Sequence, residues 1–275
     1  MSDIARDELV ESLLNRAHEA ASAAAKVVTE DRPDVMEVGS KSTLTDIVTE
    51  MDRASEALLV DRLLDGRPDD ALLGEEGAEH SGGSGVRWVI DPIDGTVNYL
   101  YREPNWAVCV GIELDGEPVG GVVLAPAFGE TYLARIGNGA FRLDSSGRRT
   151  QLQVGSVAQL SMALVATGFG YSSERRKAQA KVVAQVLPQV RDIRRLGAAS
   201  MDLCWVASGL LDGYYERGLN PWDHLAASVV VREAGGIIEG ANGSSPNQDL
   251  TIAANPGLFP KLHDLVVDLG AHTGP

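Results

Sequence analysis

The chain has 275 residues, of which 44% are hydrophobic, so it is long enough for a sizeable core in one large domain or two fused halves. Its formal net charge of −15 repels nucleic-acid backbones and anionic lipid surfaces. No uncharged apolar stretch approaches the roughly 20 residues that a membrane-spanning helix needs. We therefore expect neither direct nucleic-acid binding nor a membrane segment.

The N-terminal segment MSDIARDELVESLL is acidic and amphipathic, without the basic start and apolar centre of a signal peptide. The two cysteines, Cys109 and Cys204, both lie in apolar sequence, which favours reduced buried thiols over a disulfide or a metal site. Together these features predict a soluble cytoplasmic protein.

The first half of the chain has the pattern of two helices and several strands. Apolar residues recur at helical spacing over residues 4–28, and a second helix is expected over residues 52–64. Residues 41–49 are rich in β-branched side chains and predict a short extended segment. Further strands are expected over residues 71–73, 86–90, 106–114, 118–124 and 130–135, with a hairpin at Asp115-Gly116. We predict two helices packed on an antiparallel sheet.

From Arg148 onward, strands and helices alternate. Strands are expected over residues 163–166, 193–196 and 213–216, and helices over residues 173–187, 198–210 and 224–234. Such alternation predicts an α/β layer. The predicted fold class is therefore α/β, as one compact unit of two subdomains: an α+β half over residues 1–147 and an α/β half over residues 148–275.

Two patterns in the sequence suggest ligand binding, but we interpret both as structural features. The run Gly137-Asn-Gly139-Ala-Phe begins like a dinucleotide fingerprint, but Arg142 replaces the third glycine, so a tight turn between strands is expected. The arginines are interpreted as solvated or paired charges rather than a binding patch, namely Arg148, Arg149, Arg191, Arg194 and Arg195.

The motif DPIDGT sets Asp91 and Asp94 three residues apart, directly after an apolar strand. Pro92 lacks an N–H group and fixes φ, so the strand is expected to end there and the chain to turn, which lets both carboxylates converge. Gly95 and Thr96 are placed to open a short helix whose free N–H groups would face an anion. Because two carboxylates would repel that anion, we interpret the motif as a metal site beside a phosphate site.

An Asp-capped helix with a turn is the alternative interpretation of this motif. Two further acids favour the metal site. Glu75 follows the short apolar strand over residues 71–73, and Asp223 follows Asn220-Pro221 at an expected helix start, where it could also be an ordinary N-cap. A site made of oxygen ligands alone suits Mg²⁺, with Mn²⁺ possible, and argues against Zn²⁺.

Several spaced motifs resemble those of the inositol monophosphatases, within the lithium-sensitive, Mg²⁺-dependent sugar-phosphatase superfamily. They are Lys41-Ser-Thr-Leu-Thr-Asp46 with Asp52, Gly74-Glu75-Glu76, the DPIDGT motif, Gly197-Ala-Ala199, and the run from Trp222 to Gly236. The resemblance covers about residues 41–236. It implies a layered α-β-α-β-α sandwich, a homodimer, and hydrolysis of a phosphate monoester with two or three Mg²⁺ ions and no covalent phospho-enzyme.

The resemblance also implies roles for individual residues. The implied metal ligands are Glu75, Asp91, the carbonyl of Ile93, Asp94 and Asp223. The implied catalytic residues are Thr96, Asp52 and Glu75, with Thr96 hydrogen-bonded to Asp52 so that it positions and deprotonates the attacking water. The implied substrate contacts are Asp94, Gly95, Thr96, Ala199 and Glu216, with Lys41 as a charge on the phosphate side. A simple helix N-terminal acid remains the alternative for Asp52.

The substrate expectation rests on two features. After Gly95-Thr96 the chain reads Val97-Asn98-Tyr99, similar to the inositol branch of the family, and Glu216 matches the position that binds sugar hydroxyls. A carboxylate there suits a small phosphorylated polyol and would repel a second phosphate. We therefore expect hydrolysis of myo-inositol 1-phosphate. The alternatives are a phosphatase of histidinol phosphate, fructose 1,6-bisphosphate or 3′-nucleotides, and an interaction protein that retains the phosphatase fold.

Overall fold

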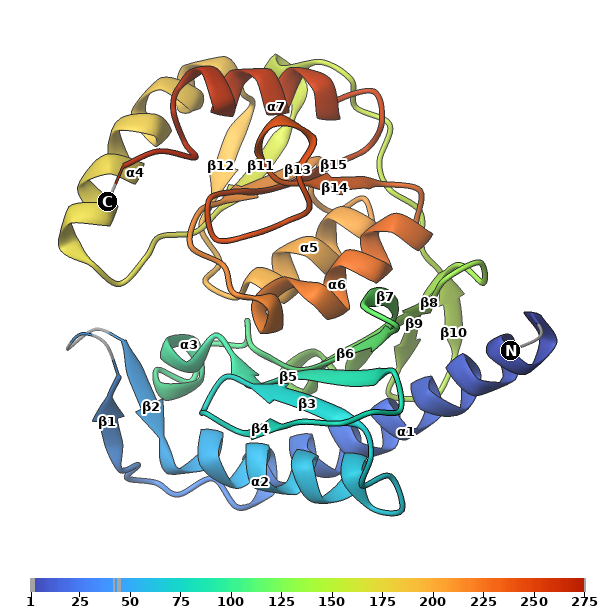
Figure 1. Ribbon diagram of the computed structural model, residues 1–275. Coiled ribbons are helices and arrows are strands. Elements are labelled where there is room, and N and C mark those ends of the chain that lie inside the picture. The colour runs from blue at the N-terminus through green and yellow to red at the C-terminus, as the bar shows by residue number, and fades with distance from the viewer. Residues whose placement is uncertain (1–2, 42, 44–45, 275) are drawn as a thin grey trace.

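The structure is a computed structural model that describes residues 3–41, 43 and 46–274. Its helices are α1 (Asp3–Glu30), α2 (Glu50–Leu64), α3 (Thr96–Leu100), α4 (Ser173–Val186), α5 (Ala199–Ala207), α6 (Pro221–Glu233) and α7 (Phe259–Asp268). Five layers are stacked from bottom to top in Figure 1: α1 with α2, an eight-stranded sheet, α5 with α6, a five-stranded sheet, and α4 with α7. Clusters of buried apolar side chains hold these layers together. The predicted α-β-α-β-α sandwich is confirmed.

The larger sheet has the strand order β10-β9-β8-β7-β6-β5-β3-β4. Its strands are β3 (Ala71–Gly74), β4 (Glu79–His80), β5 (Val86–Asp94), β6 (Ala107–Leu114), β7 (Glu117–Ala125), β8 (Glu130–Arg135), β9 (Ala140–Asp144) and β10 (Arg149–Gln151). The prediction of an antiparallel sheet is wrong at one pair, because β3 and β5 run parallel. Their parallel register pairs Gly74 with Ile90, so Glu75 and Asp91 emerge side by side at the same edge.

The smaller sheet has the strand order β12-β11-β13-β15-β14. Its strands are β11 (Leu164–Thr167), β12 (Asp192–Arg194), β13 (Gly213–Glu216), β14 (Ile237–Glu239) and β15 (Thr251–Ala254). The first three are parallel neighbours, as the alternating pattern predicts, whereas β15 pairs antiparallel with β13 and β14. The proposed division at residue 148 stays a prediction; β10, which follows it, pairs with β9 at the edge of the larger sheet.

Two short strands form a separate ribbon, β1 (Val38–Ser40) and β2 (Ile47–Thr49). Strand β2 forms the end of residues 41–49, which were predicted to be extended, and residues 42, 44 and 45 of that segment lie outside the described part. Both cysteines are buried free thiols, as predicted. Within the described residues, no helix has the length and apolar character needed to cross a membrane.

Strand β5 does not end at Pro92, so that part of the prediction is wrong. The strand continues to Asp94, but its pairing with β6 shifts: Asp91 lies opposite Cys109 and Asp94 opposite Ala107, which leaves one extra residue on β5. In a regular strand, residues three apart point to opposite faces. The bulge absorbs the extra residue, so both carboxylates turn toward the same space. Proline has no N–H to contribute to a ladder and is accommodated at this bulge.

Helix α6 lies very close to the larger sheet because two glycines face it. Gly111 of β6 and Gly121 of β7 are register partners. A Cβ atom on Gly121 would overlap the backbone of Ala226, and one on Gly111 would overlap the Leu225 side chain. The close approach brings the N-terminal end of α6, and with it Asp223, to the end of β5.

The close approach predicts that Gly121→Ala destabilises the protein. The added methyl group forces α6 away from the sheet, so we expect the free energy of unfolding to fall by about 1–3 kcal/mol in urea denaturation. Gly83→Ala is the matched control, because a Cβ there meets no atom within 4 Å. Equal stability of the two variants would contradict this description of the packing.

Candidate active site

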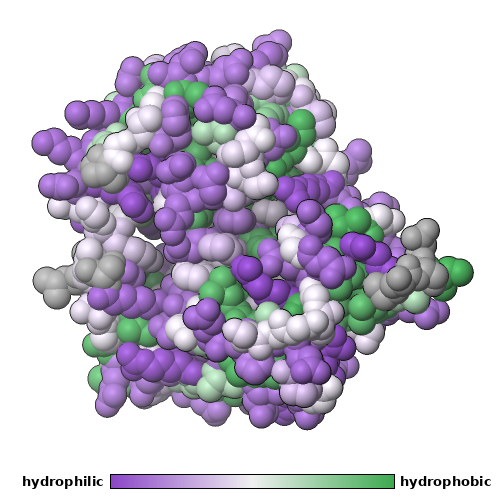
Figure 2. Space-filling view, in the orientation of Figure 1, coloured by the Kyte–Doolittle hydropathy of each residue, from purple (hydrophilic) through white to green (hydrophobic). Residues whose placement is uncertain are grey.

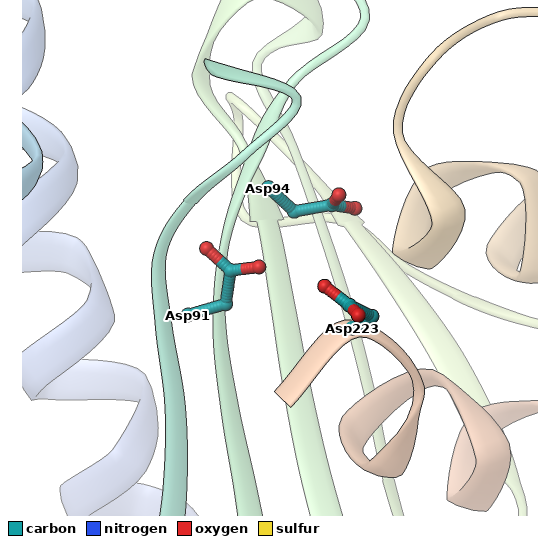
Figure 3. A group of neighbouring side chains, drawn as sticks. All are labelled: Asp91, Asp94 and Asp223. Atoms are coloured by element: carbon teal, nitrogen blue, oxygen red, sulfur yellow. The ribbon is translucent and has the colours of Figure 1, made fainter. Parts of the chain in front are cut away.

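Three aspartates converge where the larger sheet meets α6. Asp91 and Asp94 come from β5 and Asp223 from the first turn of α6, and Figure 3 shows their carboxylates turned toward a common space. One oxygen from each lies within 4.8 Å of the others. The two aspartates of β5 are buried. Residues far apart in the chain thus form one group of oxygen ligands.

The start of α6 fixes Asp223 in this position. Asn220 is the N-cap residue, Pro221 follows it, and the backbone N–H of Asn220 donates to Oδ2 of Asp223 at 2.6 Å. Asp223 is therefore the third helical residue of a capping box rather than the N-cap itself. The hydrogen bond orients its carboxylate toward Asp91 and Asp94 (Figure 3).

Asp94 is held by the N-terminus of α5. Its Oδ2 accepts a hydrogen bond from the backbone N–H of Ser200 at 2.8 Å and another from the Ser200 hydroxyl. Burial raises the pKa of Asp94 to about 6, while the hydrogen bonds from Ser200 and from the Ala199 backbone act to lower it. Ser200 was not predicted as a site residue, although its place in the first turn of a predicted helix was an available signal.

The carboxylates of Asp91 and Asp223 repel each other when both are ionised. Burial raises the pKa of Asp91 well above its usual range, and the charges of Glu75, Asp94 and Asp223 raise it further. The pKa of Asp223 is likewise raised by burial and by Glu75 and Asp94. A buried set of carboxylates that repel one another fits a divalent cation that prefers oxygen ligands, since the cation offsets the repulsion.

Glu75 lies beside this group without belonging to the three converging carboxylates. It follows β3, and its backbone N–H donates to the Ile90 carbonyl at 3.3 Å. Oε1 of Glu75 lies 2.8 Å from Nζ of Lys41, which is also 2.5 Å from Oε1 of Glu76. Burial acts to lower the pKa of Lys41, but these two glutamates outweigh it and raise that pKa. The ammonium group is thus fixed at the edge of the acidic group.

Glu56 of α2 shapes the turn that presents Glu75. Its carboxylate accepts hydrogen bonds from the backbone N–H groups of Glu76 and Ala78 at 2.8 and 2.9 Å. A Cβ atom on Gly74 would overlap this carboxylate, which explains the glycine before Glu75. Glu56 was not predicted as a site residue, because no local pattern links it to a turn 20 residues away.

Thr96 and Asp52 form a second buried pair next to the aspartates. The Thr96 hydroxyl lies 3.0 Å from Oδ1 of Asp52 and 3.1 Å from the Ile93 carbonyl oxygen, and can donate to either. Asp52 also accepts from the backbone N–H and hydroxyl of Thr49, as part of the capping box of α2. Burial raises the pKa of Asp52. Asp52 therefore caps a helix and also contacts Thr96, so the two interpretations of this residue coexist.

An open cleft of about 410 Å³ lies above this group. Figure 2 shows the hollow on the left, between the upper and lower halves of the molecule. Of the residues predicted to form the site, the cleft is lined by Lys41, Glu75, Asp94, Gly95, Ala199, Glu216 and Asp223. Asp52, Asp91, Ile93 and Thr96 are buried. Gly95 has a φ of 89°, a conformation that glycine adopts without strain.

Comparison with known proteins decides the family. The model of the inositol monophosphatase family matches residues 9–270. The chain belongs to the inositol monophosphatase family. The inositol-1-monophosphatase of Mycobacterium leprae is 45% identical over 232 residues, which cover 80% of this chain and 78% of that protein. The Nus factor SuhB of Escherichia coli is 36% identical over 252 residues, which cover 89% of this chain and 91% of that protein.

Solved structures support the same family assignment. Mycobacterium tuberculosis SuhB aligns with a TM-score of 0.79 and 38% identity, covering 97% of this chain and 98% of that chain. The Thermotoga maritima inositol monophosphatase aligns with a TM-score of 0.82 and 29% identity, and the alignment covers 96% of this chain and 98% of that chain. The chain is thus a member of a phosphatase family, and its acidic group lies where the larger sheet meets α6.

Glu216 lines the cleft at the end of β13. The Tyr214 hydroxyl donates to Oε2 of Glu216 at 2.6 Å. Burial raises the pKa of Glu216 to about 7, while Tyr214 and the charge of Arg195 act to lower it. Arg195 is an exposed side chain that lines the cleft, where its charge acts on Glu216, which agrees with its interpretation as a solvated or paired charge. A Cβ atom on Gly168 would overlap the Glu216 carboxylate, so this glycine leaves the space that Glu216 occupies.

The repulsion in the acidic group predicts that Asp91→Asn stabilises the cation-free protein. The pKa of Asp91 is raised above its ordinary 3.8, so the folded state binds more protons than the unfolded state above that pH, and its stability falls as pH rises. Asparagine does not ionise, so Asp91→Asn removes the contribution of this position to the fall of stability with rising pH. We expect the variant to be more stable than the wild type by roughly 1–3 kcal/mol at about pH 8, with the difference vanishing near about pH 4.

Urea denaturation in the presence of a chelator measures this difference. Asp61→Asn, at an exposed position on α2, is the matched control and is expected to leave stability unchanged at both pH values. An Asp91→Asn variant that is less stable than the wild type at the higher pH would show that the carboxylate contributes to folding instead of opposing it.

Proposed function

We propose that the protein is a Mg²⁺-dependent phosphomonoesterase that hydrolyses myo-inositol 1-phosphate to inositol and phosphate. The observation that carries the proposal is the converging group of Asp91, Asp94 and Asp223 at the base of a cleft, beside the buried Thr96–Asp52 pair. The name of the Mycobacterium leprae relative supports the substrate, as does a Staphylococcus aureus structure of 25% identity described as having inositol monophosphate bound.

The proposed metal ligands are Glu75, Asp91, the carbonyl of Ile93, Asp94 and Asp223. These groups supply oxygen atoms only, which suits two or three Mg²⁺ ions, with Mn²⁺ as a substitute. When bound, such ions stabilise the negative charge of a transferring phosphoryl group and lower the pKa of water. Inhibition by Li⁺ and a homodimer belong to the same proposal and rest on the family resemblance. A cytoplasmic location is proposed from the two reduced, buried cysteines.

Thr96 and Asp52 are proposed to orient the attacking water. When the Thr96 hydroxyl donates its proton to Asp52, its oxygen is left as an acceptor for a hydrogen bond from that water. Asp52 has a raised pKa because it is buried, so it is a better proton acceptor than an exposed carboxylate. The water oxygen forms the new bond to phosphorus as the bond between phosphorus and the ester oxygen breaks. The proton that the attacking water loses passes through the Thr96 hydroxyl to Asp52, and the leaving oxygen takes a proton from solvent water in the cleft to give the alcohol.

Glu216 is proposed to bind the hydroxyl groups of the leaving polyol. It lines the cleft at the end of β13, and Tyr214 fixes one of its oxygens. The remaining oxygen can accept a hydrogen bond from a substrate hydroxyl. Because burial raises its pKa to about 7, the negative charge on Glu216 increases as the pH rises through neutrality.

The name Nus factor SuhB of the Escherichia coli relative favours a second candidate function, that of an interaction protein. The buried aspartates and the Thr96–Asp52 pair favour the phosphatase, because a surface used only for protein binding has no need of repelling carboxylates at the base of a cleft. Phosphate release with and without Mg²⁺ separates the two functions.

The proposal predicts a substrate-dependent effect of Glu216→Gln. Loss of a charged acceptor for inositol hydroxyls should lower kcat/KM for inositol 1-phosphate by about ten- to a hundredfold, with little effect on a simple aryl phosphate that has no such hydroxyls. Phosphate release with Mg²⁺ is measured for both substrates, and Glu30→Gln, at an exposed position on α1, serves as the control.

The wild type is tested on the same assay with histidinol phosphate, fructose 1,6-bisphosphate and 3′-phosphoadenosine 5′-phosphate. Preference for one of these over inositol 1-phosphate would overturn the proposed substrate. If Glu216→Gln lowers kcat/KM by the same factor for every substrate, Glu216 acts on the phosphate group and not on the polyol.

A further inference from the structure

The side chain of Asn98 joins two segments of the chain that border the cleft. Asn98 is the third residue of α3, and its side chain is half-buried and lies outside the lining of the cleft. Its Nδ2 donates to the carbonyl oxygen of Asn105 and to that of Leu196, both at 2.7 Å. Asn105 lies just before β6, and Leu196 just before α5. A primary amide has two N–H groups, so each of them holds a different segment.

The hydrogen bond to Leu196 fixes the turn that leads from β12 into α5. Leu196 is 98 residues from Asn98 along the chain. Among the described residues, the backbone of residues 196 and 197 makes no hydrogen bond other than this one. The turn before α5 is therefore held to α3 by a single side chain. We call the contact between residues 94–98 and 196–200 the α3–α5 junction.

Two glycines allow the close approach at the α3–α5 junction. Gly95 and Gly197 have φ values of 89° and 92°, which glycine adopts without strain. A Cβ atom on Gly95 would lie 2.9 Å from the carbonyl oxygen of Asn105 and 3.1 Å from Cβ of Ala198. A Cβ atom on Gly197 would lie 2.9 Å from Nδ2 of Asn98. Each glycine thus leaves the space that the opposite segment fills.

The α3–α5 junction also contains Asp94, one of the three converging carboxylates. Its Oδ2 accepts hydrogen bonds from the backbone N–H of Ser200, at 2.8 Å, and from the Ser200 hydroxyl. The two segments are therefore joined at two points, by Asp94 with Ser200 and by Asn98 with Leu196. A single point of contact lets one segment pivot on the other, whereas two points fix their relative orientation.

We propose that Asn98 is a positioning residue for the cation site, because it holds the start of α5 where Ser200 can orient Asp94. The inference rests on the proposed function, in which Asp94 is a metal ligand. Asn98 lies outside the cleft lining, so it acts through Ser200 and Asp94. Without its two hydrogen bonds, α5 shifts relative to α3, and Asp94 is less well directed toward the space that it shares with Asp91 and Asp223 (Figure 3).

Hydrogen–deuterium exchange of the cation-free protein, followed by NMR, tests the junction itself. Asn98→Asp has nearly the same shape but no N–H group to donate, and Asn98→Ala removes the amide without adding a charge. In both variants the backbone N–H of Ser200 should exchange about tenfold faster than in the wild type, because its hydrogen bond to Asp94 opens more often. The N–H of Val122, in the middle of β7, should exchange at the wild-type rate and so show that the fold is retained.

Mg²⁺ binding tests whether the junction serves the cation site. Calorimetric titration at neutral pH should give a Kd for Mg²⁺ that is about tenfold higher in both variants, as expected when a residue that orients a ligand is lost. In the phosphatase assay, the Mg²⁺ concentration for half-maximal rate should rise by the same factor, while kcat at saturating Mg²⁺ falls by less than about threefold. A general loss of structure would instead lower kcat at every Mg²⁺ concentration.

Asn15→Asp, at an exposed position on α1, is the matched control for the added charge and should behave like the wild type in all three measurements. Unchanged exchange of the Ser200 N–H in both Asn98 variants would overturn the proposal. Faster exchange with wild-type Mg²⁺ affinity would also overturn it, because Asn98 would then hold the turn without serving the site.

The measurements separate this inference from the proposed function. A wild type that binds Mg²⁺ but releases no phosphate would contradict the proposed phosphatase, while the exchange rates and the calorimetric Kd would still decide the role of Asn98. A wild type that binds no Mg²⁺ would overturn both.

Discussion

Mutual repulsion between buried carboxylates is the constraint on which this protein depends. Asp91, Asp94 and Asp223 converge from two layers of the sandwich, and burial together with the charge of Glu75 raises the pKa of each. The fold holds them in place with hydrogen bonds from Ser200 and Asn220. Their convergence opposes folding of the cation-free chain, and a bound divalent cation offsets that cost.

Three local irregularities of the fold bring these carboxylates together. The parallel pairing of β3 with β5 places Glu75 beside Asp91, and the bulge at Pro92 turns Asp91 and Asp94 to the same side. The glycine pair of β6 and β7 lets α6 approach the sheet closely enough to bring Asp223 to them. A sandwich with regular antiparallel pairing and larger residues at the two glycines would have the same layers but no convergent group.

Much of this arrangement follows from local sequence patterns, and the rest depends on contacts between distant segments. Apolar periodicity predicted the principal helices and most of the strands, and the DPIDGT motif with Glu75 and Asp223 predicted an acidic group. Proline at position 92 indicated an interrupted strand, but a missing N–H does not distinguish a strand end from a bulge, so the predicted end was wrong. Ser200 reaches Asp94 across 106 residues, a pairing that no periodicity or turn signal encodes.

The central claim is that buried carboxylates with raised pKa values are the cation ligands, and calorimetric titration of Mg²⁺ into the cation-free protein tests it most directly. Titrations at about pH 6.5 in two buffers of different ionisation enthalpy give the number of protons exchanged on binding. Because Asp91 and Asp223 have pKa values well above the usual range and that of Asp94 is about 6, binding should release protons, and the number released should decrease as the pH is raised. Binding without any proton release, or no binding of Mg²⁺ at all, would contradict the account.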